Sequence, residues 1–220
     1  MRNEFINDSF FSGIRQCARC SLCDIQKPLL DISHQADVMW VGLSAVRVDD
    51  VMTARPLSSD TRSGGLVEEI ESRLPNLSFY RTNLVKCLPE SNGKIRYPTI
   101  AEMKSCMPNL ASEIKVLSPK IVLLLGKKVA EQFLKQKGFG NFTFDEEYNY
   151  DEYVIGDTTY VPVHHPSFIL VYKRRNIESY IGQVSKIISK NFPNIEIKLV
   201  KRTWIANNVN ENIVEQLSLL

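Results

Sequence analysis

Five cysteines are the residues of this chain best suited to chemistry, and three of them are clustered. Cys17, Cys20 and Cys23 form two overlapping C-x-x-C pairs, a spacing that lets two thiolates reach one metal ion or cluster. With Cys87 and Cys106, the thiolates of Cys17 and Cys20 could ligate one zinc ion or one iron–sulfur cluster. A redox dithiol and a set of buried free thiols are the alternatives. We expect Cys23 to be a bystander, unless it replaces a partner in an alternative pair.

A strand predicted at 78–87 carries polar chemistry near its end. It is aromatic and β-branched at its start and is stopped by Pro89. Asn83 and Cys87 are four residues apart, which on a strand places them on one face about 13 Å apart at ~3.3 Å per residue. The strand is therefore predicted to serve a polar pocket and a cysteine cluster. The plainer interpretation is an Asn that ends a strand and a buried free Cys.

The elements that must position these side chains alternate along the chain. Apolar runs predict buried strands of the kind found in parallel sheets, the last one fed by a hairpin that turns at Gly156-Asp157. The runs are 36–43, 78–87, 119–126 and the end of 153–163. Helices are predicted between and after them, at about 63–74, 99–117, 127–137 and 168–190. The pattern βαβαβαβα predicts an α/β fold, a three-layer α/β/α sandwich with a mostly parallel four-stranded sheet. A further strand at 195–204 and a short helix within 205–220 are also predicted.

Length and composition set limits on function. The 220 residues predict one domain, with a cysteine-bearing N-terminal segment (1–30) and a C-terminal appendage (193–220). A net charge of +2 excludes a bulk polycation, so nucleic-acid contact requires a local basic patch. No apolar run approaches 18 residues, which predicts no membrane span. We expect a monomer in a reducing, cytoplasmic compartment, where cysteines serve metals or remain free.

Several motifs, in this order and spacing, resemble the uracil-DNA glycosylase superfamily. They are Cys17-x-x-Cys20-x-Leu22, Asn83-Leu84-Val85-Lys86-Cys87-x-Pro89, Arg96-x-Pro98-x-x-x-Glu102-x-x-x-Cys106, Pro119-Lys120-Ile121-Val122 with Leu125-Gly126, and His165-Pro166-Ser167. The similarity is to the iron–sulfur branches called families four and five, over roughly 14–190. It implies a 4Fe–4S cluster on Cys17, Cys20, Cys87 and Cys106, and excision of a DNA base by hydrolysis of its N-glycosidic bond.

The chain departs from that family at the base pocket. Family four carries a functional Glu where this chain has Leu43, whereas family five also has Leu and uses an Asp in the following loop. The corresponding run here ends at Asp60, which becomes the candidate for that role. Leu57 replaces the Phe that stacks on the flipped base, and base–aromatic stacking is worth roughly 1–3 kcal/mol. The resemblance thus assigns catalysis to Asp60, Asn83 and His165, and the base pocket to Gly42, Leu43, Ser44 and Leu57.

DNA contact requires donors near the mouth of that pocket. Helix N-termini and a basic run supply candidates, although a charge run on a helix is usually only a solvated face. The candidates are Ser63, Gly64, Lys127, Ser167, Lys173, Arg174 and Arg175.

The sequence therefore predicts a monofunctional DNA glycosylase, because no lysine is placed for Schiff-base chemistry. The altered pocket favours a modified pyrimidine, such as the hydroxymethylated or glucosylated cytosine of viral DNA, and so an antiviral defence role. A divergent uracil or deaminated-base repair enzyme is the alternative. A catalytically inactive nucleic-acid-binding module and a zinc-stabilised nucleotide-binding protein are further rivals.

Overall fold

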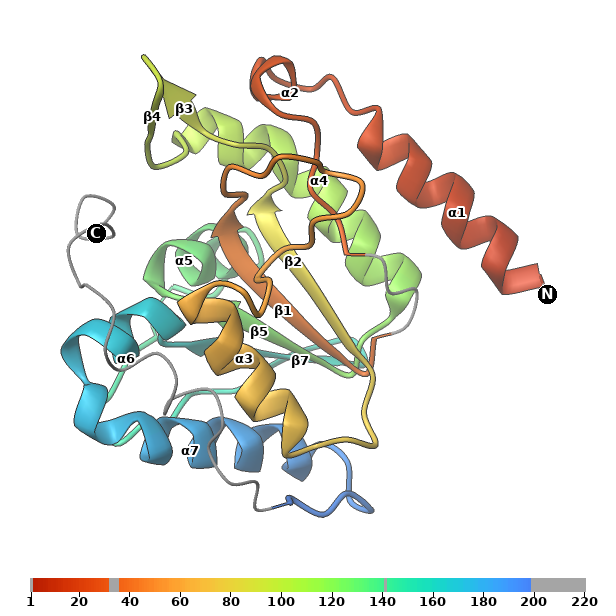
Figure 1. Ribbon diagram of the computed structural model, residues 1–220. Helices are drawn as coiled ribbons and strands as arrows, with labels where there is room; N and C mark the ends of the chain where they lie inside the picture. Colours follow the sequence, from red (N-terminus) through yellow and green to blue (C-terminus); the bar gives the residue numbers. More distant parts are fainter. Residues whose placement is uncertain (1, 32–35, 141, 199–220) are drawn as a thin grey trace.

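A twisted sheet forms the centre of the molecule (Figure 1). The computed structural model describes residues 2–31, 36–140 and 142–198. The sheet has the strand order β2-β1-β5-β7-β6, in which β6 is antiparallel to β7 and the other pairings are parallel. The strands are β1 (Val38–Ser44), β2 (Phe79–Val85), β5 (Ile121–Leu125), β6 (Tyr153–Ile155) and β7 (Thr158–Val163). The α/β/α prediction is confirmed, with five strands instead of four because both arms of the predicted hairpin join the sheet.

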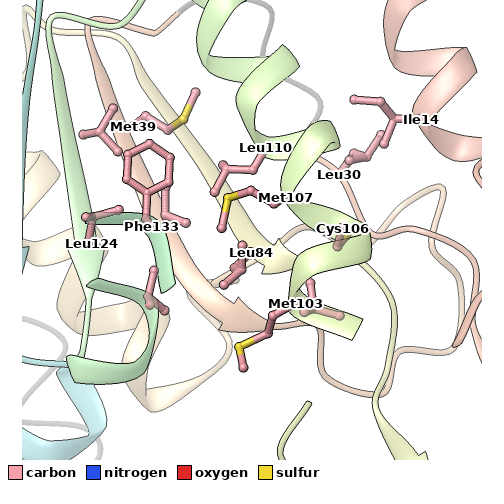
Figure 2. Close-up of a cluster of buried hydrophobic side chains, with 14 of the residues drawn as sticks. Ile14, Leu30, Met39, Leu84, Met103, Cys106, Met107, Leu110, Leu124 and Phe133 are labelled. Atoms are coloured by element: carbon pink, nitrogen blue, oxygen red, sulfur yellow. The ribbon is translucent and has the colours of Figure 1, made fainter. Parts of the chain in front are cut away.

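Helices cover both faces of the sheet, which explains why the strands are apolar throughout. Along β1, Met39 and Val41 pack into one hydrophobic cluster, and Val38 and Trp40 into the other. The first cluster is formed with α1 (Arg2–Arg15), α4 (Ile100–Leu117) and α5 (Lys127–Lys135), and part of it is drawn in Figure 2. The second is formed with α3 (Arg62–Ser72), α6 (Pro166–Tyr172) and α7 (Ile177–Lys190). The short elements are α2 (Leu22–Ile25), the hairpin of β3 (Glu90–Ser91) and β4 (Lys94–Ile95), and the 3-10 turn η1 (Arg174–Asn176).

The sequence correctly predicted where α4 begins but not the course of the C-terminal helices. Thr99 and Glu102 form the predicted capping box at the start of α4. The single helix predicted at 168–190 is wrong, because the chain leaves helical geometry at Lys173 and divides into α6, η1 and α7. Residues 195–198 form no strand, and the rest of the predicted strand and the helix in 205–220 lie outside the described residues. No helix in the described part of the chain is long and apolar enough to cross a membrane.

The order of connections creates a crevice at the carboxyl edge of the sheet. From β1 the chain passes through α3 to its neighbour β2, and from β2 it returns through α4 to β5 on the other side of β1. Ligands bind at such switch points in open α/β sheets, because the loops there separate to opposite faces. The loop after β1, the end of β2 and the loop after β7 all reach this edge (Figure 1).

Candidate active site and cysteine centre

A cavity of about 810 Å³ lies at this edge. The end of β1 contributes Leu43 and Ser44, β2 contributes Asn83, and the loop after β7 contributes His165. The remaining wall is the loop between β1 and α3, which supplies most of the lining from Val46 to Ser63. The side chains predicted from sequence for catalysis, Asp60, Asn83 and His165, therefore line one cavity.

Asn83 is held at the floor of the cavity by the sheet itself. Its side chain is buried, and it sits beside Gly42 in the parallel pairing of β1 and β2. A Cβ at Gly42 would lie 2.3 Å from Asn83 Oδ1, so only glycine leaves room for this amide. Among the described residues, no side chain or backbone group hydrogen-bonds the Asn83 amide. Both its donor and its acceptor are available to a ligand.

His165 caps the first turn of α6 and is held in one tautomer. Its Nδ1 accepts the backbone N–H of Ser167 at 3.1 Å and lies 2.7 Å from Ser167 Oγ. A nitrogen that accepts a backbone N–H carries no proton, so the proton of the neutral ring is on Nε2. Burial lowers the pKa of His165 to about 4. The imidazole is therefore a neutral hydrogen-bond donor at physiological pH.

His164, the residue before His165, is held in place by a cluster of aromatic side chains. Tyr150 Oη lies 2.7 Å from His164 Nδ1, and Tyr180 Oη donates to the His164 carbonyl at 2.9 Å. The His164 ring also stacks on Phe168, with centroids 5.2 Å apart. Tyr150 belongs to the irregular, tyrosine-rich stretch 142–152. It braces the loop that presents His165.

Acidic groups lie at the open side of the cavity. Asp60 is exposed, lines the cavity, and accepts a hydrogen bond from Ser58 Oγ at 2.9 Å. Asp49 lines the cavity as well. Asp50 instead caps its own turn, accepting from Met52 N at 2.8 Å and Thr53 Oγ1 at 3.0 Å. Of the two neighbouring aspartates, only Asp49 faces the cavity.

The other predicted site residues divide into two groups. Leu43, Ser44, Leu57 and Ser63 line the cavity, and Gly42 lies beneath it. Among the residues predicted to contact DNA, Ser167 holds His165, and Lys173 Nζ is paired with Glu146 Oε1 at 2.7 Å. Gly64 is packed against backbone carbonyls, whereas Lys127, Arg174 and Arg175 are exposed.

Three arginines lie around the cavity, and two of them, Arg55 and Arg81, are not among the residues predicted from sequence. Arg47 and Arg55 line it, and Arg81 lies in the adjacent strand. Arg55 pairs with the buried Asp31 at 3.0 Å, and Arg47 pairs with Glu90. A charged residue within the apolar strand β2 was the one available signal for Arg81, because buried arginines require partners.

The cysteines gather in a separate hollow. Cys17, Cys20, Cys23, Cys87 and Cys106 all line it, although they come from the α1–α2 region, the segment after β2, and α4. Strand β2 ends at Val85, so the prediction that Cys87 continues the strand face of Asn83 is wrong. Cys87 packs instead in the cluster that contains Leu84. The same segment nevertheless serves both sites.

Hydrogen bonds distinguish the thiols. Asn109 Nδ2 donates to Cys17 Sγ at 3.3 Å, and the Lys86 backbone N–H donates to Cys106 Sγ at 3.4 Å. Cys23 Sγ instead donates to the Cys20 carbonyl at 3.1 Å. Burial and the neighbouring thiols raise the pKa of Cys87 to about 12. A metal centre would displace these thiol protons and bind the neighbouring sulfur atoms as thiolates.

The donor set is that of a thiolate-ligated metal site. In the described part of the chain, no three His, Cys, Asp or Glu side chains converge closely enough to hold one metal ion. A zinc ion requires sulfurs about 2.3 Å from its centre. Iron–sulfur clusters are held by four thiolates and are larger than one ion. The hollow is lined by five cysteines, and N–H groups of Asn109 and Lys86 donate to the sulfurs of Cys17 and Cys106, as expected around the ligands of such a cluster.

A buried ion pair lies between the two sites. Lys86 and Glu113 are fully buried and paired with each other. Lys86 Nζ also donates to Thr82 Oγ1 at 2.7 Å and to the Asn83 carbonyl at 2.6 Å, while Tyr80 Oη donates to Glu113 Oε1 at 2.9 Å. The pair therefore ties the backbone at Asn83 to α4, the helix that carries Cys106.

The fold and these two sites define a three-layer α/β protein with a polar cavity at its switch point and a separate cysteine centre. The family profile described as the uracil DNA glycosylase superfamily matches residues 26–186. Two relatives, both called type-4 uracil-DNA glycosylase, are also similar to the chain. The protein of Pyrobaculum aerophilum is 30% identical over 129 residues, which are 57% of this chain and 63% of that protein. The protein of Sulfurisphaera tokodaii is 26% identical over 187 residues, 81% of this chain and 78% of that protein.

The chain belongs to the uracil DNA glycosylase superfamily, because the profile match extends over most of its length. The resemblance read from the motifs is confirmed at this level. The chain spans less than two thirds of the length of the Pyrobaculum relative.

Proposed function

We propose that this protein is a DNA glycosylase that hydrolyses the N-glycosidic bond of a base flipped into the cavity. The observation that carries the proposal is the pairing of two prepared groups in one cavity. The Asn83 amide has both hydrogen-bonding ends available, and His165 presents a neutral Nε2–H. A base inside a duplex is out of reach of such groups, so the target is extruded or already unpaired.

The side chains have distinct roles in the proposed reaction. Asn83 reads the Watson–Crick edge of the base. The C1′–N bond breaks with its electron pair leaving on the base, and His165 Nε2–H donates to the base oxygen that gathers the negative charge. Asp60 orients the water whose oxygen bonds to C1′, and offsets the positive charge on the sugar. One proton of that water ends on the released base and the other stays on the new sugar hydroxyl.

The reaction proposed is monofunctional. Among the described residues, no lysine lines the cavity, so no amine is available there to form a Schiff base with the sugar. The expected product is an abasic site in an unbroken strand.

We further propose that Cys17, Cys20, Cys87 and Cys106 hold a 4Fe–4S cluster. Such a cluster supplies a rigid cross-link between the N-terminal segment, the end of β2 and α4. These residues bind it and exclude water from it, since Cys87 and Cys106 are buried. Cys23 keeps its S–H bonded to the Cys20 carbonyl and is not needed.

The substrate proposed is a pyrimidine that carries a polar substituent. At about 810 Å³ the cavity lies in the upper part of the range of roughly 300–1,000 Å³ typical of drug-sized ligands. Beyond Asn83 and His165 its lining is mixed, and Arg47, Asp49 and Ser59 are among its polar residues. A site built to bond a substituent rejects a base without one, because its own polar groups then lack partners. Glucosylated or hydroxymethylated cytosine of viral DNA fits this description, which implies a defence role.

Uracil is the competing substrate, since both relatives are called uracil-DNA glycosylases. The deciding experiment incubates the protein with matched oligonucleotides containing uracil, hypoxanthine, xanthine, hydroxymethylcytosine or its glucosylated form. Alkali then cleaves at abasic sites, and the fragments are counted. We expect the greatest release from the glucosylated base. Uracil release without release of the glucosylated base would overturn the substrate proposal.

Site variants separate the activity from contamination. Asn83→Ala and His165→Ala should strongly slow the release, and Asp157→Asn, in the exposed turn between β6 and β7, should not. Ser59→Ala should reduce release of the glucosylated base more than release of uracil. If no DNA in the panel yields abasic sites, the glycosylase proposal itself fails and a binding module remains.

A further inference from the structure

The cavity wall contains a residue in a strained backbone conformation. Leu57 has φ 50°, the left-handed region that residues with a Cβ seldom adopt. Its side chain lines the cavity and packs against the buried cluster beneath α3. Such conformations persist only where surrounding contacts enforce them, and they gather at functional sites. Contacts from neighbouring residues must therefore stabilise this backbone conformation of Leu57.

Arg81 is the residue that holds it. Its Nη1 donates to the Leu57 carbonyl at 2.7 Å. Its Nε and Nη2 donate to Glu71 Oε1 at 3.0 Å and Oε2 at 2.6 Å, a bidentate pair with α3. The guanidinium is almost completely buried, so it has little freedom to move. This planar group spans a carboxylate and a carbonyl at fixed angles, which a lysine cannot do.

The backbone of Arg81 is fixed as well. Its N–H donates to Asp31 Oδ2 at 2.8 Å, and Asp31 in turn pairs with Arg55 on the cavity wall. The loop is thus attached to Arg81 at Leu57 and, through Asp31, at Arg55. The carboxylates of Asp31 and Glu71 and the guanidinium of Arg81 thus support one stretch of cavity wall.

Gly64 allows the loop to pack closely against α3. A Cβ there would lie 1.9 Å from the Ser58 carbonyl oxygen and 2.3 Å from that of Leu57. The loop therefore rests directly on the first turn of α3, against backbone atoms that have no room to yield. Asp60 follows three residues after Leu57, so the position of its carboxylate depends on this packing of the loop against α3.

We propose that Arg81 is a positioning residue that fixes the segment 54–60, and thereby sets where Leu57 meets the base and where Asp60 meets the water. It touches neither substrate nor water itself. The inference rests on the proposed function for its turnover readout. It does not rest on that function for its structural readout.

The test compares Arg81→Lys with Arg73→Lys. Arg73 is equally buried and pairs with Glu178 at 2.7 Å, at the far end of α3. Hydrogen–deuterium exchange of 53–61 and the steady-state constants for the best oligonucleotide substrate are measured for both. Arg81→Lys should speed exchange in 53–61 and lower kcat about 100-fold with little change in KM, since misplacing catalytic groups by about 1 Å has that effect. Arg73→Lys should do neither.

A second pair of variants tests the same packing of the loop without altering a charged side chain. Gly64→Ala should displace the loop and reproduce the Arg81→Lys pattern, while Gly182→Ala, in α7 with open space around it, should not. Unchanged exchange in 53–61 for both Arg81→Lys and Gly64→Ala would overturn the inference. So would an equal loss of kcat in Arg73→Lys. A wild-type protein without glycosylase activity would defeat the proposed function alone, because the exchange comparison would still stand.

Discussion

The cavity and the cysteine centre share one stretch of chain but differ in what surrounds them. Asn83 opens into a large hollow lined by loops, whereas Cys87 lies in a small one enclosed by α4 and the N-terminal segment. Among the described residues the Asn83 amide in the cavity has no hydrogen-bond partner, whereas Cys23, Cys87 and Cys106 in the cysteine centre are buried. Structural metal sites are closed and catalytic sites keep an open position. In the proposed function, the open cavity binds a substrate transiently and the enclosed centre holds a permanent cofactor.

Between them lies the pair of Lys86 and Glu113, which joins the two sites mechanically. A buried ion pair is weak evidence for stability, because apolar replacements are often neutral. Its bonds to the Asn83 carbonyl and to the helix of Cys106 suggest that it fixes the geometry between the sites. Changes to the cysteine centre should therefore affect stability first, and changes to the cavity should affect turnover alone.

The largest effect is expected from the cysteine ligands. Cys87→Ser should lose iron and labile sulfide and should strongly destabilise the fold, since the binding energy of a structural metal is folding energy, on the order of 10 kcal/mol for zinc sites. Iron and sulfide per chain, the absorbance of the purified protein and the urea midpoint measure this. Cys23→Ser is the control and should keep its iron. If Cys23→Ser loses iron while Cys17→Ser retains it, the ligand set is wrong.

Breaking the buried pair should be the next largest. Lys86→Met leaves the Glu113 carboxylate buried without its cation, which should lower the free energy of unfolding by about 3–5 kcal/mol. The double variant Lys86→Met/Glu113→Leu should recover much of that stability yet remain slow, because Asn83 loses a backbone partner. Urea unfolding and turnover are both measured, with the exposed Lys128→Met as control. Wild-type turnover in the double variant would remove the link between the sites.

Cavity variants should change turnover without changing the fold. Asn83→Ala, His165→Ala and Asp60→Asn should each lower kcat, and for His165 the loss should be about 10²–10³-fold, as for one donor to developing charge. Far-UV circular dichroism and iron content should stay at the wild-type level. Full activity in Asp60→Asn would transfer the water-orienting role, with Asp49 next because it lines the same cavity.

The smallest effect is a pH dependence to which His165 contributes together with His164, because burial lowers the pKa of both rings. Burial lowers the pKa of the His165 ring from an ordinary 6.5 to about 4. Between these values the unfolded chain binds a proton that the native ring does not, so stability is full above pH 6.5 and decreases as the pH falls toward 4. The His165→Asn variant should show a shallower decrease. An NMR titration of the His165 ring with a midpoint near 6.5 would contradict the neutral donor.

Local signals in the sequence were sufficient for much of the architecture. Apolar runs identified the parallel strands because both faces of the sheet are covered, and Thr99 with Glu102 marked the start of α4. The break at Lys173 could not be read, since no Gly or Pro interrupts the apolar spacing there and a tertiary ion pair with Glu146 accompanies it. The hairpin of β6 and β7 was predicted, but its sequence did not show that β6 also joins the sheet, because β7 pairs with the distant strand β5.

For the sites, residue types and order identified the cysteines, Asn83 and His165, and only the folded chain decided what each can do. The tautomer of His165 depends on the Ser167 amide, and the availability of Asn83 depends on the absence of a side chain at Gly42. The positioning role proposed for Arg81 depends on its hydrogen bond to the carbonyl of Leu57, 24 residues earlier in the chain. The identity of a residue and its local propensity are written in the chain. The partners that set its charge, tautomer and backbone strain are brought together by contacts between distant segments.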